Sequence, residues 1–165
     1  MADDKQVPVK VLDIGKSLPL HVSPSQLSSF DRCNLAYWFS SVAGWREPTT
    51  LAQIIGTLVH NVLENLLKIT QEKRTKEVAW NLLRENGEEI ININSKWLKE
   101  EDITNLKDKS AESLKGYFDL EDPAKIVIDL DDLERPISAI FDSVKLYGRL
   151  DRMTRDGLVK ITDYK

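Results

Sequence analysis

Apolar residues recur with the 3.6-residue period of a helix through much of the first two thirds of the chain. Ser23, Pro24 and Gln26 form a helix-start signal, and the spacing after them predicts a helix from Ser23 to about Ala43. The aromatic side chains of this helix are expected mainly in the core. The alternative is that some of them form a surface on which unpaired bases stack: Tyr37, Trp38, Phe39 and Trp45.

A second, strongly amphipathic helix is predicted over residues 52–67, and two charged helices are predicted around 76–93 and 103–118. Because the charged helices carry no site signature, we interpret residues 72–118 as a helical insertion. Extended chain is expected at 125–128, and Pro136 marks the strand predicted over 133–141 as an edge or bulged strand. Residues 1–22 are expected to be a polar extension with a short strand at 9–12, and residues 23–165 a single domain.

Near the end of the chain, alternating apolar and polar residues flank Asp156-Gly157, a pair typical of hairpin turns. Two registers are open. A two-residue turn would pair Arg155 with Leu158. A three-residue loop with Gly157 in the left-handed conformation would pair Thr154 with Leu158.

The register decides whether this hairpin can carry chemistry. The two-residue turn would place Asp151 and Asp163 on opposite faces, whereas the three-residue loop would place Asp151, Asp163 and Lys165 on one face. Two neighbouring carboxylates stay ionised at low cost when a cation lies between them, and the lysine would reach a phosphate bound there. The second register therefore predicts a site for phosphodiester hydrolysis, and the first predicts ordinary solvated side chains.

Charge and composition narrow the class of protein. The chain has 165 residues, 41% of them hydrophobic and 30% charged, which suits one globular domain. Its net charge of −4 gives no overall basic field for nucleic acid, so binding would depend on a local groove and on bound cations. We see no membrane span or signal peptide and expect a cytoplasmic location. The single cysteine, Cys33, excludes an internal disulfide.

Four segments in this order resemble the RecB-like nucleases of the PD-(D/E)XK superfamily, which include CRISPR-associated and AddB-type enzymes. They are residues 23–27 with Cys33, the Gly56-x-x-x-His60 segment, residues 148–152 and residues 163–165. The resemblance implies an α/β (α+β) restriction-endonuclease-like core, in which a helix precedes a mixed β-sheet. It also implies that a further helix and strand of that core, and three cluster cysteines, would lie beyond Lys165, so that the nuclease domain would be truncated.

The resemblance also implies roles for individual residues. His60, Asp151 and Asp163 would be metal ligands, with the backbone carbonyl of Tyr164 as a further contact, and Lys165 would be the catalytic lysine. Oxygen ligands suit Mg²⁺ or Mn²⁺, and an imidazole favours Mn²⁺. Two nearby acids, Glu64 and Glu134, could bind the metal through water or orient the imidazole, but we interpret them as structural.

Cys33 lies where iron–sulfur members place their first cluster cysteine. A 4Fe-4S cluster is therefore expected only if the natural chain continues with more cysteines. The alternative for Cys33 is a small buried residue on a helix.

The resemblance to RecB-like nucleases implies a metal-dependent DNA nuclease, an exonuclease acting on single strands or DNA ends in recombination, repair or phage replication. A helicase or recombination partner would fit this function. The alternative is a non-catalytic DNA-binding or scaffold module that keeps the nuclease fold.

Overall fold

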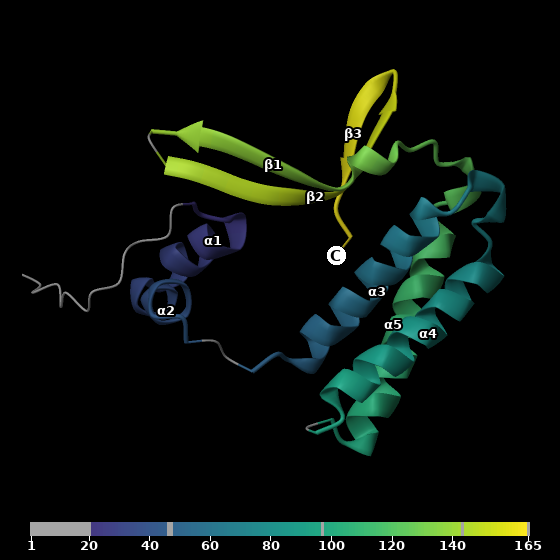
Figure 1. Ribbon diagram of the computed structural model, residues 1–165, viewed down its shortest axis with the longest axis horizontal. Coiled ribbons are helices and arrows are strands. Elements are labelled where there is room, and N and C mark those ends of the chain that lie inside the picture. The colour runs from purple at the N-terminus through teal and green to yellow at the C-terminus, as the bar shows by residue number, and fades with distance from the viewer. Residues whose placement is uncertain (1–20, 46–47, 97, 143, 165) are drawn as a thin grey trace, which may run out of the picture. The chain divides into compact units, whose positions relative to one another are not determined.

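The computed structural model describes residues 21–45, 48–96, 98–142 and 144–164, and Figure 1 labels its helices and strands. The strand expected at 9–12 and Lys165 lie outside these residues. The helices are α1 (Pro24–Arg32), α2 (Asn34–Tyr37), a π-helix (Trp38–Val42), α3 (Leu51–Lys68), α4 (Lys76–Asn94) and α5 (Glu100–Leu120). The strands are β1 (Leu133–Phe141), β2 (Val144–Asp156) and β3 (Leu158–Thr162), in the sheet order β1-β2-β3.

The chain divides into two compact units. The first consists of the described residues within 21–45 and 139–146, and the second of those within 48–138 and 147–164. Short 3₁₀ turns in the second unit lie at Gln71–Lys73, Pro123–Lys125 and Leu130–Asp132. None of the described helices has the length and apolar character needed to cross a membrane.

In the first unit, the predicted start of the helix is confirmed and the helical segments reach Val42, but the prediction of one uninterrupted helix is wrong. The Ser23 hydroxyl accepts from the backbone N–H of Gln26, and the Gln26 side chain accepts from the backbone N–H of Ser23. The helix ends at Cys33, whose φ of −164° and ψ of 108° are extended, and restarts as α2. The interruption falls in a run rich in weak helix formers, so little intrinsic helical stability is lost there: Ser28, Ser29, Asp31, Cys33 and Asn34.

In the second unit, α3, α4 and α5 lie side by side (Figure 1). The predictions of these three helices are confirmed. Their shared core contains buried side chains from each: Ile54, Leu58, Val62, Leu63 and Leu66 of α3, Ala79 of α4, and Leu106, Leu114 and Tyr117 of α5. The segment interpreted as an insertion therefore contributes directly to the core that supports α3.

The start of α3 depends on a local hydrogen-bond pattern. The Thr50 hydroxyl accepts from the backbone N–H of Gln53, and the Gln53 side chain accepts from the backbone N–H of Thr50. We expect Thr50→Ala to lower the free energy of unfolding by about 1 kcal/mol, because one N–H at the helix start loses its acceptor. Urea unfolding measures this. Thr104→Ala, within α5, is the matched control and should change stability little; equal losses in both variants would contradict the capping role.

The β2–β3 hairpin has neither of the registers expected from the sequence. Asp156 pairs with Leu158 and Arg152 pairs with Thr162, with only Gly157 between the strands. Gly157 has a φ of +71°, a conformation that glycine adopts readily, and this permits a turn tighter than either alternative. The strand prediction over 133–141 is confirmed as β1.

Candidate metal centre

Three side chains from three elements of the second unit meet at one place. His60 of α3, Glu134 of β1 and Asp151 of β2 each present one possible ligand atom, and these atoms lie within 4.8 Å of one another. All three residues are half-buried. One imidazole nitrogen and two carboxylates form a donor set suited to Mn²⁺ or Mg²⁺.

His60 is held by the end of the chain that follows β3. Its Nε2 lies 2.6 Å from the backbone carbonyl oxygen of Tyr164, and its Nδ1 lies 3.6 Å from Oδ2 of Asp151. Because a carbonyl oxygen can only accept a hydrogen bond, this contact requires the proton on Nε2. A neutral imidazole then presents the lone pair of Nδ1 on the side of Asp151, which is the arrangement that a metal ligand needs.

Asp151 is tied to the same segment. Its Oδ2 accepts a hydrogen bond of 2.7 Å from the backbone N–H of Tyr164. One step beyond the last pair of the β2–β3 ladder, Asp151 would face Asp163, but β3 ends at Thr162. The backbone of Tyr164 therefore links the imidazole and the carboxylate, through its carbonyl and its N–H respectively.

Glu134 joins this cluster although its position in the sequence offered little sign of it. Its φ of +47° lies in the left-handed region, which a side chain such as glutamate rarely adopts. Strained backbone of this kind persists where surrounding structure holds it and is frequent at functional sites. The carboxylate lies 3.6 Å from Nη1 of Arg149, a side chain that is 59% exposed. From the sequence, Glu134 was a possible water-mediated ligand for which a structural role was preferred; in the structure its carboxylate is one of the three clustered ligand groups.

A hollow of about 350 Å³ opens beside the cluster. It is lined by Gly56, Thr57, His60, Asn61, Glu64, Glu134, Arg149 and Asp151. A Cβ added at Gly56 would meet no atom within 4 Å, so this glycine leaves the wall open. Glu64 lies one helical turn after His60 and forms an ion pair of 2.7 Å with Lys68.

The remaining residues of the expected site lie elsewhere. Asp163 borders an adjoining hollow of about 480 Å³, which it shares with His60 and Tyr164, and it is not one of the three clustered ligands among the described residues. Lys165 lies outside the described residues. Cys33 belongs to the first unit and is exposed, so the interpretation of it as a small buried residue is wrong.

Arg152 is a buried residue that connects the end of α5 to the segment that carries Tyr164. Its guanidinium is 2% exposed and forms two hydrogen bonds to the Glu121 carboxylate, of 2.5 and 2.9 Å. It also donates to the Tyr164 hydroxyl at 2.9 Å and to the Thr162 hydroxyl at 3.0 Å. Arg152 thus fixes the β2–β3 hairpin and Tyr164, two residues beyond it, against the end of α5.

The electrostatics of this support are those of a buried ion pair. Burial by itself would raise the pKa of Glu121, but hydrogen bonds and charge from Arg152 outweigh it and hold that pKa below its ordinary value. Burial raises the pKa of Tyr164 to about 12, so its phenol stays neutral and can accept from Arg152. Because the same tyrosine binds His60 and Asp151 through its backbone, a chain of hydrogen bonds connects the ion pair to the cluster.

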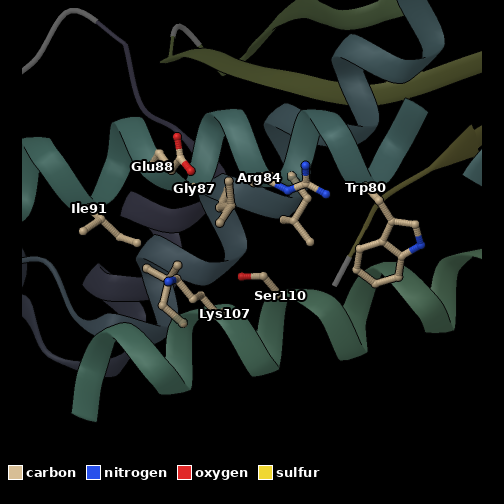
Figure 2. A pocket seen from close by; sticks show the side chains of 10 residues that line it. Trp80, Arg84, Gly87, Glu88, Ile91, Lys107 and Ser110 are labelled. Carbon is tan, nitrogen blue, oxygen red and sulfur yellow. The ribbon is translucent and has the colours of Figure 1, made fainter. Parts of the chain in front are cut away.

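A third hollow, between α4 and α5, has a lining of a different kind. Its volume is about 490 Å³, and Trp80 and Ile91 lie toward opposite ends of it (Figure 2). Glu88 is the only carboxylate among its lining residues, beside Arg84 and Lys107. A single carboxylate between two cations is a poor ligand set for a divalent metal, so this hollow lacks the donor set that His60, Glu134 and Asp151 provide.

Comparisons with known proteins bear on what this cluster does. Residues 21–165 match the family model of the PD-(D/E)XK nuclease superfamily. Comparisons with curated proteins and with solved structures found no match. The match covers both units, and nucleases of this superfamily use divalent metals, for which the cluster offers suitable ligands. The chain therefore belongs to the PD-(D/E)XK nuclease superfamily.

Proposed function

We propose that this protein is a Mg²⁺- or Mn²⁺-dependent deoxyribonuclease that hydrolyses phosphodiester bonds at the His60–Glu134–Asp151 cluster. The observation that carries the proposal is the convergence of these three ligand atoms within 4.8 Å in a member of a nuclease superfamily. The ligand atoms suit a divalent cation, because the carboxylates of Glu134 and Asp151 would repel each other unless a cation lay between them.

We propose the following roles for the residues of this site. His60 and Asp151 would hold the cation, with Glu134 as the third ligand, and the cation would supply charge neutralisation at the phosphate and a lower pKa for a nearby water. Asp163, the Tyr164 carbonyl and Lys165 keep the roles that the resemblance to RecB-like nucleases implies: two metal contacts and the catalytic lysine. In the structure the Tyr164 carbonyl accepts from His60, so its first effect is to orient the imidazole.

Arg149 lines the hollow beside this cluster. Its guanidinium lies in the wall of the hollow, 3.6 Å from Glu134, and is 59% exposed. An exposed guanidinium at this place can form paired hydrogen bonds with a phosphate, which gives the acidic chain a local attraction for DNA. We propose that Arg149 guides the scissile phosphate toward the metal ligands.

The finer function follows from the RecB-like resemblance. We propose exonuclease action on DNA ends or single strands in recombination, repair or phage replication, with a helicase or recombination partner. The test compares linear and covalently closed circular DNA, each incubated with Mn²⁺, with Mg²⁺ and with EDTA. Degradation of linear DNA alone, and only with metal, is expected. Cutting of the circles would contradict exonuclease action. Metal binding without any cleavage would favour the non-catalytic DNA-binding or scaffold module.

The strained backbone of Glu134 allows a test that separates metal binding from folding. Glycine adopts a φ of +47° more readily than glutamate. We therefore expect Glu134→Gly to leave the melting temperature without metal unchanged or higher. The increase in melting temperature on adding Mn²⁺ should shrink, because one ligand of the native site is gone. Thermal unfolding with and without Mn²⁺ measures both effects.

Asp142 provides the matched control. Its φ of +45° is the other positive value among the described residues that are not glycine, and it lies in the first unit. Asp142→Gly relieves the same kind of strain without touching the cluster, so its response to Mn²⁺ should equal that of the wild type. An unchanged Mn²⁺ response in Glu134→Gly would remove Glu134 from the proposed ligands.

A further inference from the structure

The first unit contains an aromatic stack built by unusual backbone. α2 continues into a π-helix, Trp38–Val42, a form that is rare and occurs often at functional sites. After it, Gly44 has a φ of +77° and turns the chain back, so that the N–H of Trp45 donates to the carbonyl oxygen of Phe39 at 2.8 Å. This backbone places the Trp45 ring over the Phe39 ring.

The rings lie in a fixed order. The centroids of Phe39 and Trp45 are 5.0 Å apart, and their planes meet at 26°, which is a stacked pair. Trp38 contacts Phe39 edge-on, with centroids 5.1 Å apart and planes at 82°. Phe39 is half-buried, whereas Trp45 is 69% exposed. One side of the indole therefore rests on Phe39, and much of the rest is open to solvent.

We propose that the outer face of Trp45 is a stacking platform for an unpaired nucleobase. This inference rests on the proposed function, in which the substrate is DNA. A flat ring already stacked on one side presents its other side to another flat ring, and every base has such a face. The backbone hydrogen bond at Phe39 orders the indole before binding, so little conformational entropy is lost when a base stacks on it.

The charge of the chain favours this mode of holding a strand. It contains 23 Lys and Arg residues and 27 Asp and Glu residues, so cations are not in excess. Affinity for single-stranded DNA that came from phosphate contacts alone would depend on a local group of cations, because the chain as a whole has no basic field. Stacking on an aromatic ring adds affinity for an unpaired strand without adding positive charge.

The test compares two single-stranded 20-mers of equal charge by fluorescence anisotropy in EDTA, where metal-dependent cleavage is stopped. One is oligothymidylate and the other has the same backbone without bases. Wild-type protein should bind oligothymidylate more tightly than the abasic strand. Trp45→Ala should weaken binding to oligothymidylate about tenfold or more and leave binding to the abasic strand unchanged. Trp45→Phe should lose less, because it keeps an aromatic face.

Leu35→Ala is the control, because Leu35 is an apolar residue of the same unit that is 63% exposed and lies outside the stack of Trp38, Phe39 and Trp45. It should bind both strands as the wild type does. Equal affinity of wild type and Trp45→Ala for oligothymidylate would overturn the platform, as would an equal loss for both strands. Self-association that depends on Trp45, without an effect on DNA, would identify a contact between copies and also overturn it.

The cleavage assay distinguishes a failure of the Trp45 platform from a failure of the proposed nuclease activity. Metal-dependent cleavage of DNA by the wild type, with no effect of Trp45→Ala on oligothymidylate binding, overturns only the platform. Base-dependent binding through Trp45 without cleavage in any metal supports the platform and contradicts the nuclease.

Discussion

Asp151→Asn is expected to lower the rate of metal-dependent DNA cleavage by about 10³-fold. Asn keeps the size of the side chain, and its carbonyl oxygen can still accept from the Tyr164 N–H, which now binds Oδ2 at 2.7 Å. What is lost is the negative charge beside Nδ1 of His60, 3.6 Å away. A bound divalent ion stabilises a transition state by several kcal/mol, and about 4 kcal/mol corresponds to a factor of 10³.

Initial rates on end-labelled linear DNA at a fixed Mn²⁺ concentration measure this effect. The melting temperature without metal should change little, while its increase on adding Mn²⁺ should be much reduced. Asp119→Asn is the matched control, because Asp119 is an exposed residue near the C-terminal end of α5 and is neither one of the clustered ligands nor in the lining of the two hollows beside them. Cleavage by Asp151→Asn at the rate of the wild type would remove Asp151 from the proposed site.

Glu121→Ala is expected to lower the free energy of unfolding by about 3 kcal/mol, because it leaves the guanidinium of Arg152 buried without its carboxylate. Urea unfolding at neutral pH measures the loss. Glu112→Ala removes an exposed partner of Lys109, whose ion pair spans 3.0 Å, and should cost less than about 0.5 kcal/mol. The double variant Glu121→Ala/Arg152→Met should be more stable than Glu121→Ala alone, because no buried charge remains.

The stability that Glu121 contributes should depend on pH in a defined direction. The pKa of Glu121 is lower in the folded protein than its ordinary value of 4.5. Its contribution is therefore fully present above about pH 4.5 and disappears as the pH falls through the lower folded pKa. The stabilities of wild type and Glu121→Ala should converge on acidification through this window. A constant difference between them down to low pH would contradict the assignment of the shift to this ion pair.

Comparing Asp151→Asn with Glu121→Ala also separates a role in catalysis from a role in stabilising the fold. Asp151→Asn should abolish most activity at nearly unchanged stability, whereas Glu121→Ala should lose stability first. If Arg152 positions the cluster through Tyr164, the surviving folded Glu121→Ala protein should also respond less to Mn²⁺. An undiminished Mn²⁺ response would limit the ion pair to a structural role.

Local sequence was enough to predict most of the elements. The apolar periodicity of α3, α4 and α5 indicates which faces of these helices are buried, and burial is what stabilises them. The Ser23 capping signal also appears in the structure, because such a cap involves only neighbouring residues. The end of that first helix was missed, since no proline or glycine marks the break at Cys33, and weak helix propensity alone does not locate an end.

The tight hairpin illustrates the limit of local rules. Asp156-Gly157 correctly indicated a turn, but its register depended on how β2 and β3 pair along their whole length. The difference of one residue decides which side chains oppose each other. Here the chain leaves β3 after Thr162, and Tyr164 binds Asp151 through its backbone N–H.

The sequence by itself determined the superfamily, the helical and strand segments, and the candidate residues His60 and Asp151, because motif spacing and periodicity are properties of local sequence. Only the tertiary structure added Glu134 to the cluster and assigned Arg152 to the buried support of Tyr164. These contacts join residues up to 104 positions apart, as in the hydrogen bond from His60 to Tyr164. Such contacts arise from the packing of α3 and α5 with the hairpin, and short-range patterns carry no information about that packing.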